Sequence, residues 1–218
     1  MNTMHLILGT KAWSSWSLRP WLVMKRSTLA FTETVLQLRW EGASAEIAKV
    51  SPSAKVPVLK DGDLSVWDSL AISEYLAEKS PIPLWPKDGK ARALARSATA
   101  EMHSGFAALR NQCPMDIGLR TTKSVEEELA ADLKRLVALL GGLRRDHGAG
   151  GEFLFGAWTI ADAFFTPVAT RVRSYDLDLA HSGDDGVAKA YLNTLLATPE
   201  FLAWETDALA NGAETSES

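Results

Sequence analysis

The sequence is poor in cysteine and histidine, and both shortages exclude kinds of site. Its 218 residues include one cysteine, Cys113, and four histidines. A single cysteine cannot form an intramolecular disulfide, so we expect a reducing compartment, the cytoplasm, rather than a disulfide-stapled secreted domain. The scattered histidines and the lone cysteine match no metal-ligand spacing, so we expect no metal site. Cys113 falls at the end of a predicted helix, where a structural role is expected.

The chain also lacks a basic excess and a long apolar run. Its 23 lysine and arginine residues are outnumbered by 27 aspartate and glutamate residues, which gives a formal net charge of −4. This charge balance argues against a nucleic-acid partner. No apolar run reaches the ~18 residues of a membrane span, and no basic segment followed by a long apolar core begins the chain. We therefore expect no membrane partner and no signal peptide.

A serine-rich turn is the most informative stretch that is present. The segment Trp13-Ser14-Ser15-Trp16-Ser17-Leu18-Arg19-Pro20 lies between a strand-like apolar run and a helix-like one. It predicts strand, turn and helix, with Ser17 as the N-cap. Ser14 and Ser15 would then precede a helix start, where unpaired N–H groups and the helix dipole favour an anion such as a thiolate. On this stretch alone, plain capping and turn formation are the favoured explanation of the same serines.

The first 80 residues predict a small α/β unit in the order β-α-β-α-β-β-α. A second strand at 31–38 implies a right-handed crossover and a parallel pair. An Asp61-Gly62 turn between two short apolar runs predicts a hairpin. Pro57 must start its strand or lie at an edge, and it is a candidate for a cis peptide bond. Ser69 is predicted to be the N-cap of the helix at 70–79.

The remainder of the chain predicts only helices. Three prolines between residues 80 and 86 indicate a linker, placed at 81–88. Helices follow at 91–112, after a capping box at 124–127, and after a second capping box, Thr159-Ile160-Ala161-Asp162. Two more are expected near 187–196 and 199–209. The predicted organisation is an α/β domain at 1–80, a linker at 81–88 and an all-α domain at 89–218.

This organisation resembles that of the cytosolic glutathione transferases. The resemblance covers nearly the whole chain, and four signatures carry it: Ser14-Ser15-Trp16-Ser17-Leu18-Arg19, Lys55-Val56-Pro57, Asp68-Ser69 and Thr159-Ile160-Ala161-Asp162. The first is similar to the Ser-Ser-Cys-Ser-Trp-Arg motif of zeta-class members, with Trp16 in place of Cys and Leu18 in place of Trp. The resemblance implies a thioredoxin-like first domain, a homodimer, and glutathione as co-substrate in a detoxifying conjugation.

Site roles follow from that resemblance. It implies a cis Pro57 and a backbone edge at Val56 that pairs with the cysteinyl part of glutathione. Ser69 would bind the γ-glutamyl carboxylate and Asp68 its ammonium group. Trp16 counts among the glutathione-contacting residues of the serine turn.

The glycyl end of glutathione has weaker candidates. Lys55 and Trp40 could reach the glycyl carboxylate, although Lys55 fits a solvated charge and Trp40 a packing role. Asp68 likewise fits a partner of the helix dipole.

Three functions are expected from these residues. The first is conjugation of the glutathione thiolate to a small electrophile, with Ser14, or next Ser15, stabilising the thiolate. The second is a glutathione-dependent cis/trans isomerase of the maleylacetoacetate isomerase type, and the third a non-catalytic binding module of the same fold.

The electrophile is expected to bind between the domains. The residues proposed to line its pocket are Trp13, Met102, His103, Phe106 and Arg110. Met102 and Phe106 fit a core role equally well.

Overall fold

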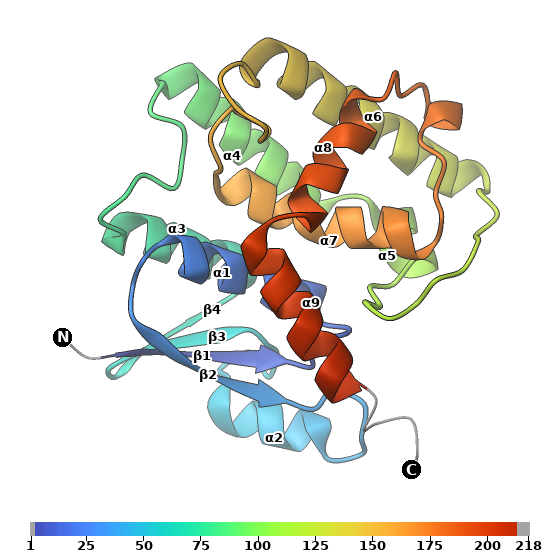
Figure 1. Ribbon diagram of the computed structural model, residues 1–218. Coiled ribbons are helices and arrows are strands. Elements are labelled where there is room, and N and C mark those ends of the chain that lie inside the picture. Colours follow the sequence, from blue (N-terminus) through green and yellow to red (C-terminus); the bar gives the residue numbers. More distant parts are fainter. Residues whose placement is uncertain (1–2, 213–218) are drawn as a thin grey trace.

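The computed structural model describes residues 3–212, and its N-terminal part is built on one four-stranded sheet (Figure 1). The strands are β1 (Met4–Gly9), β2 (Phe31–Leu36), β3 (Val58–Asp61) and β4 (Leu64–Trp67), in the spatial order β2-β1-β3-β4. β1 runs parallel to β2 and antiparallel to β3, and β3 pairs with β4 as the predicted hairpin. The crossover from β1 to β2 contains a helix, as a parallel pair requires.

Helices cover both faces of this sheet. α1 (Ser15–Arg26) and α3 (Ser69–Lys79) lie side by side on one face, and α2 (Ala43–Val50) covers the other (Figure 1). β1 is therefore buried along nearly its whole length, whereas the edge strands β2 and β4 are half exposed. The two helices that follow β1 and β4 begin at the same end of the sheet, which brings their N-termini together.

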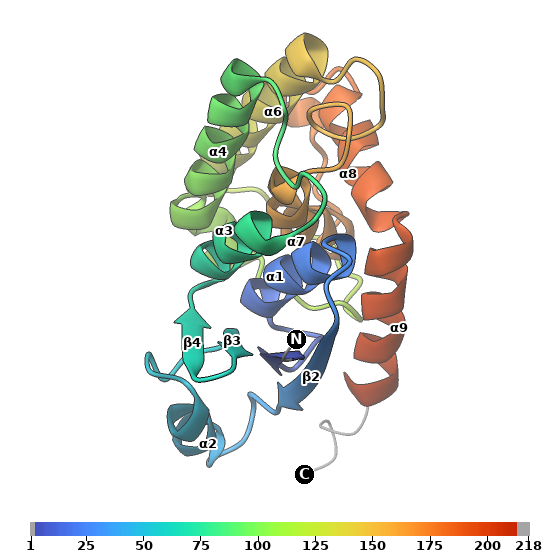
Figure 2. The same cartoon turned by 90° about the vertical axis from the view of Figure 1, so that its left-hand side faces the viewer.

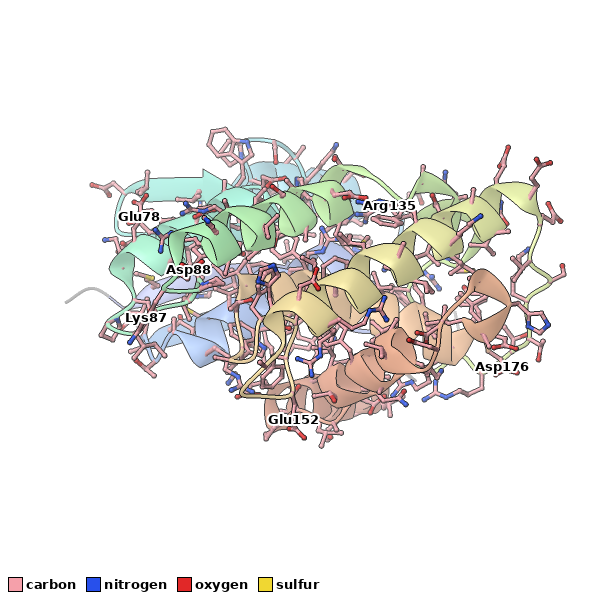
Figure 3. The ribbon with its side chains drawn as sticks, turned by 90° about the horizontal axis from the view of Figure 1, so that it is seen from above. Glu78, Lys87, Asp88, Arg135, Glu152 and Asp176 are labelled. Atoms are coloured by element: carbon pink, nitrogen blue, oxygen red, sulfur yellow. The ribbon has the colours of Figure 1, made fainter. Side chains whose placement is uncertain are left out.

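The second part of the chain consists of helices. They are α4 (Gly89–Ser104), α5 (Ala107–Gln112), α6 (Glu127–His147), α7 (Ile160–Ser174), α8 (Val187–Leu196) and α9 (Pro199–Gly212), with a short 3₁₀ turn at Ala180–Ser182. Viewed from above, α4 and α6 run side by side, and Arg135 reaches from α6 to a bidentate pair with Glu101 at 2.6 and 2.8 Å (Figure 3). α7 lies at the centre, and all its residues except Arg173 are buried. No helix within residues 3–212 is long and apolar enough to cross a membrane.

The last helix returns to the first domain. Figure 2 shows α9 running alongside α1 and β2. The indole N–H of Trp204 donates to the carbonyl of Lys11 at 3.0 Å. The buried ammonium of Lys11 pairs with Glu33 at 2.6 Å and with Asp207 at 2.7 Å. These contacts join the first domain to the last helix of the chain, whose residues are more than 170 positions away in the sequence.

Three predicted helix caps are wrong by one to three residues. α1 begins at Ser15 with Ser14 as its cap, because the hydroxyl of Ser17 is taken by the N–H of Gly9 in β1 at 2.9 Å. Asp68, not Ser69, caps α3, because its carboxylate accepts the first free N–H groups of the helix. α6 begins at Glu127 rather than after Ser124, where the exposed Val125 has no core to pack on.

The predicted helix at 91–112 is two helices. α4 ends at Ser104 with Gly105 as its C-cap, and Phe106 takes a left-handed conformation with φ of 58°. The guanidinium of Arg110 donates to the carbonyls of Met102, His103 and Gly105, which have no partner at a helix end. The break is therefore held by a side chain from the following helix.

The capping box at α7 is confirmed. Asp162 is fully buried, and its carboxylate accepts the N–H and O–H of Thr159, the N–H of Leu154 and the O–H of Tyr191. Burial raises the pKa of Asp162. This arrangement gives the motif a structural role.

Candidate active site

A cavity of about 440 Å³ opens where α3 begins beside the serine turn and the loop before β3. Its wall consists of residues from three separate segments of the first domain: Trp16, Ser53, Lys55, Val56, Pro57, Trp67, Asp68 and Ser69. Of the residues predicted to contact glutathione or its thiolate, Ser14, Ser15 and Trp40 are outside this wall. Ser53 and Trp67 belong to it although no motif in the sequence singled them out.

A backbone edge forms one side of the cavity. The Val56–Pro57 peptide bond is cis, as expected. The ladder of β3 begins at Val58, so the peptide groups of Val56 take no part in the sheet. The hydroxyl of Ser51 accepts the N–H of Lys55 at 3.2 Å and donates to its carbonyl at 2.6 Å, which fixes the loop that leads into this edge.

Ser69 presents an unsatisfied hydroxyl to the same cavity. The residue is 1% exposed, and its Oγ has no hydrogen-bond partner within residues 3–212. Ser69 is the first residue of α3, where N–H groups lack intrahelical partners and the dipole favours an anion. A buried polar atom without a partner is costly and rare, and at a cavity wall it indicates a ligand contact.

Asp68 lies next to Ser69 and stays ionised. Its Oδ1 accepts the N–H groups of Leu70 and Ala71 at 2.7 and 3.3 Å, and its Oδ2 lies 3.2 Å from Nε2 of His103. The hydrogen bond from His103 is the main cause that lowers the pKa of Asp68 to about 2. Asp68 also has a φ of 74°, a strained conformation for a residue with a side chain. His103 comes from α4, a contact that no pattern in the sequence could reveal.

The two serines ahead of α1 differ in their hydrogen bonds. The hydroxyl of Ser14 accepts the N–H of Ser17 at 3.3 Å and donates to the Oγ of Ser17 at 2.8 Å. The Oγ of Ser15 accepts an N–H from Nη2 of Arg171 at 3.2 Å. Both serines are 5% exposed. They lie beside the cavity wall rather than in it.

Trp16 connects this turn to the cavity. Two guanidinium groups lie over its indole, that of Arg19 at 4.4 Å and that of Arg110 at 4.9 Å from the ring centre. His103 meets the same ring edge-on at 5.3 Å. The aromatic wall of the cavity is therefore backed by cations from both domains.

The remaining predicted residues take other roles. Trp40 is 54% exposed and folds over Gly42. Met102 and Phe106 belong to the hydrophobic core. The ring of Trp13 stacks on the guanidinium of Arg39 at 3.7 Å.

The tyrosine hydroxyls and the cysteine thiol, the other side chains that could activate or attack a substrate, are hydrogen-bonded or buried. The hydroxyls of Tyr75, Tyr175 and Tyr191 donate to Asp61, the carbonyl of Pro114 and Asp162 respectively. Cys113 is buried, and burial raises the pKa of its thiol. Among the described residues, no group of three or more histidine, cysteine, aspartate or glutamate side chains could hold a metal ion.

Comparison with known proteins shows the family to which the chain belongs. A model of the glutathione S-transferase N-terminal domain matches residues 13–79. A probable maleylacetoacetate isomerase of Caenorhabditis elegans is 30% identical over 171 residues, which are 76% of this chain and 77% of that protein. The chain belongs to the glutathione S-transferase family. Glutathione S-transferase 1 of Dianthus caryophyllus is 32% identical over 64% of this chain, and the match spans 65% of that relative.

Solved glutathione transferases share the whole fold. A glutathione transferase homologue from Burkholderia, solved with bound glutathione, has a TM-score of 0.72 at 22% identity, covering 96% of this chain and all of that one. Maleylacetoacetate isomerase from Anaeromyxobacter dehalogenans, also solved with glutathione, has a TM-score of 0.66 at 26% identity, covering 95% and 98%. The predicted fold class, a thioredoxin-like domain followed by an all-helical domain, is confirmed.

Proposed function

We propose that this glutathione transferase conjugates the thiolate of glutathione to a small electrophile. The observation that carries the proposal is the neighbouring pair of an unpartnered hydroxyl on Ser69 and an ionised carboxylate on Asp68 in one cavity wall. An α-amino acid group presents a carboxylate and an ammonium side by side, and this pair is complementary to it. The γ-glutamyl end of glutathione is such a group.

The other parts of the tripeptide have matching partners. The carboxylate would accept the O–H of Ser69 and sit at the positive end of α3, while the ammonium would donate to Asp68 in a charge-assisted bond. The unused peptide groups of Val56 would pair with the cysteinyl residue, as an added strand pairs with a sheet edge. Lys55, exposed at the cavity wall, would attract the glycyl carboxylate.

The thiol would then lie toward the serine turn. A hydrogen bond from Ser14 or Ser15 to the sulfur favours the charged form, and so does the start of α1. Each unit by which the thiol pKa falls below its usual ~8.5 raises the thiolate fraction at neutral pH by close to tenfold.

Calorimetric titration with glutathione and turnover of chlorodinitrobenzene test the proposal together. We expect saturable binding, and conjugation that falls when the thiol is blocked. A folded protein that neither binds glutathione nor turns over this substrate would contradict it. Binding without turnover of any electrophile in a panel would instead favour the non-catalytic module.

An isomerase is the second candidate. It is favoured by the similarity to a probable maleylacetoacetate isomerase over three quarters of both chains. Trp16 stands where the zeta-class motif has cysteine, which speaks against it. Loss of maleylacetoacetate absorbance, dependent on catalytic amounts of glutathione, would decide for the isomerase.

We also propose a cytoplasmic homodimer. Leu64 on the edge strand β4 and Leu94 on α4 are 47% and 41% exposed, one in each domain. An isologous contact of the first domain of one subunit with the second domain of the other would cover both. Light scattering should give twice the chain mass, and Leu64→Glu should shift it toward the monomer.

A further inference from the structure

We propose that Arg171, from the second domain, is a positioning residue that acts through Ser15 to stabilise the thiolate of bound glutathione. The inference rests on the proposed function and deepens it, because it names the hydroxyl that faces the sulfur and the group that polarises it.

The first step is the count of hydroxyl protons at the serine turn. Ser14 uses its proton for the Oγ of Ser17 and its oxygen for the N–H of the same residue. Ser15 accepts an N–H from Arg171, and its own O–H has no acceptor among the described residues. Ser15 is therefore the hydroxyl that can donate to a thiolate without losing an existing bond, whereas Ser14 would have to release Ser17.

The second step is the rigidity of Arg171. Its side chain is buried, with Nε donating to the carbonyl of Cys113 and Nη1 to the carbonyl of Pro167, both at 2.9 Å. These two bonds fix the plane of the guanidinium, so that Nη2 points at Ser15. A donor held in this way needs no reorganisation when the sulfur becomes charged.

The third step is the charge around the turn. The guanidinium groups of Arg19, Arg110 and Arg171 lie close enough to repel one another, and the carboxylates that offset them are Asp68 at Arg19 and Asp132 at Arg110. Arg19 is fully buried, and none of its three nitrogens has a hydrogen-bond partner within residues 3–212. Positive charge is thus in excess at the domain interface, in a region of low dielectric where its effect on a nearby anion is large.

The chemistry is a simple ionisation. The S–H bond of glutathione breaks, the electron pair stays on sulfur and the proton leaves to solvent. Ser15 keeps its proton and donates a hydrogen bond to the sulfur. The N–H from Arg171 draws electron density from the Ser15 oxygen and makes its O–H a stronger donor, as cooperative hydrogen bonds do.

The test compares Arg171→Met with Arg173→Met. Arg173 is on the same helix, but it pairs with Glu205 of α9 and does not face the turn. The bound thiol is titrated by the ultraviolet absorbance of the thiolate, and binding of S-methylglutathione, whose methylated sulfur has no proton to lose, is measured in parallel. We expect Arg171→Met to raise the pKa of the bound thiol by about one unit, a tenfold loss of thiolate at neutral pH, with S-methylglutathione affinity unchanged. Arg173→Met should leave both values unchanged.

The outcomes separate the two proposals. Failure of the wild-type protein to bind S-methylglutathione would contradict the proposed function. Binding with an unchanged thiol pKa in Arg171→Met would overturn the role of Arg171.

If Arg171→Met does not fold, two serine variants test the same inference. Ser15→Ala leaves both carbonyl bonds of Arg171 in place, and we expect it to raise the thiol pKa more than Ser14→Ala does. The reverse order would overturn the inference. Where the double variant folds, Arg171→Met should add little in the Ser15→Ala background, and fully additive shifts would exclude action through Ser15.

Discussion

Replacing Ser69 by alanine should make this protein more stable and, at the same time, a poorer binder of glutathione. The hydroxyl of Ser69 is buried and has no partner among the described residues, so the folded chain carries an uncompensated desolvation cost. If glutathione is the missing partner, its carboxylate removes this cost on binding. Stability and affinity should therefore change in opposite directions.

The magnitudes follow from the burial of that oxygen. A buried hydroxyl without a partner costs about 1–3 kcal/mol, and alanine is also the better helix former. The loss of packing around the missing oxygen offsets part of this gain, so we expect Ser69→Ala to add about 1 kcal/mol to the free energy of unfolding. For a chain of this size that is a rise of roughly 2–4 °C in melting temperature. A lost hydrogen bond to a carboxylate weakens binding by about 1.5–3 kcal/mol, or roughly 10–150-fold.

Melting curves with and without glutathione, together with calorimetric titration, measure both effects. Ser73→Ala is the matched control, because Ser73 is one turn further along α3 and equally buried, but its hydroxyl donates to the carbonyl of Ser69 at 2.8 Å. The control should change neither affinity nor stability by more than about 0.5 kcal/mol, because the lost bond and the gained helix propensity nearly cancel. A Ser69→Ala protein that is less stable than wild type, or that binds glutathione equally well, would refute the reasoning.

Three further changes test the acid, the cap and the last helix. Asp68→Asn keeps the cap but removes the charge. Because the folded pKa of Asp68 is lowered to about 2, its contribution is present above about pH 4 and lost as the pH falls toward 2. The stability difference from wild type, about 1 kcal/mol after allowance for the half-exposed carboxylate, should thus shrink over that range in acid-unfolding curves. Asp162→Ala leaves the buried N–H and O–H groups around it without an acceptor. It should lower the free energy of unfolding by about 3–5 kcal/mol, measured from the urea midpoint. Lys11→Met removes the ammonium that pairs with Glu33 beneath α9, and limited proteolysis should cut α9 faster than in wild type.

Much of the fold was predictable because its signals are local. Alternating and helical apolar patterns, an Asp-Gly turn and a proline cluster lie within short stretches, and they indicated the β-α-β-α-β-β-α order. The exact cap of α1 was not predictable, because it depends on a residue distant in the sequence. Ser17 loses the cap of α1 to Ser14 because β1 brings the N–H of Gly9 to its hydroxyl.

The candidate site divides in the same way. Val56, Pro57, Asp68 and Ser69 lie in motifs of two or three residues and were predicted, and they share one cavity wall. The contact of His103 with Asp68 joins residues 35 positions apart and depends on where the end of α4 lies relative to the start of α3. No periodicity or spacing carries information about such a contact.

The residues that would bind glutathione and the residues that hydrogen-bond to them come from different domains, and this has a functional consequence. The first domain holds the groups that would recognise glutathione, a backbone edge and two helix starts. The second domain adds cationic or hydrogen-bonding side chains to each of these starts: His103 to Asp68 at α3, and Arg171 to Ser15 at α1. Since Asp68 and Ser15 would face opposite ends of the γ-glutamylcysteine unit, the packing of the two domains sets the electrostatics at the ammonium and at the sulfur together. A change that loosens this packing should therefore weaken both glutathione affinity and thiol ionisation, whereas a change confined to the cavity wall, such as Ser69→Ala, should weaken affinity and leave the pKa of the bound thiol unchanged.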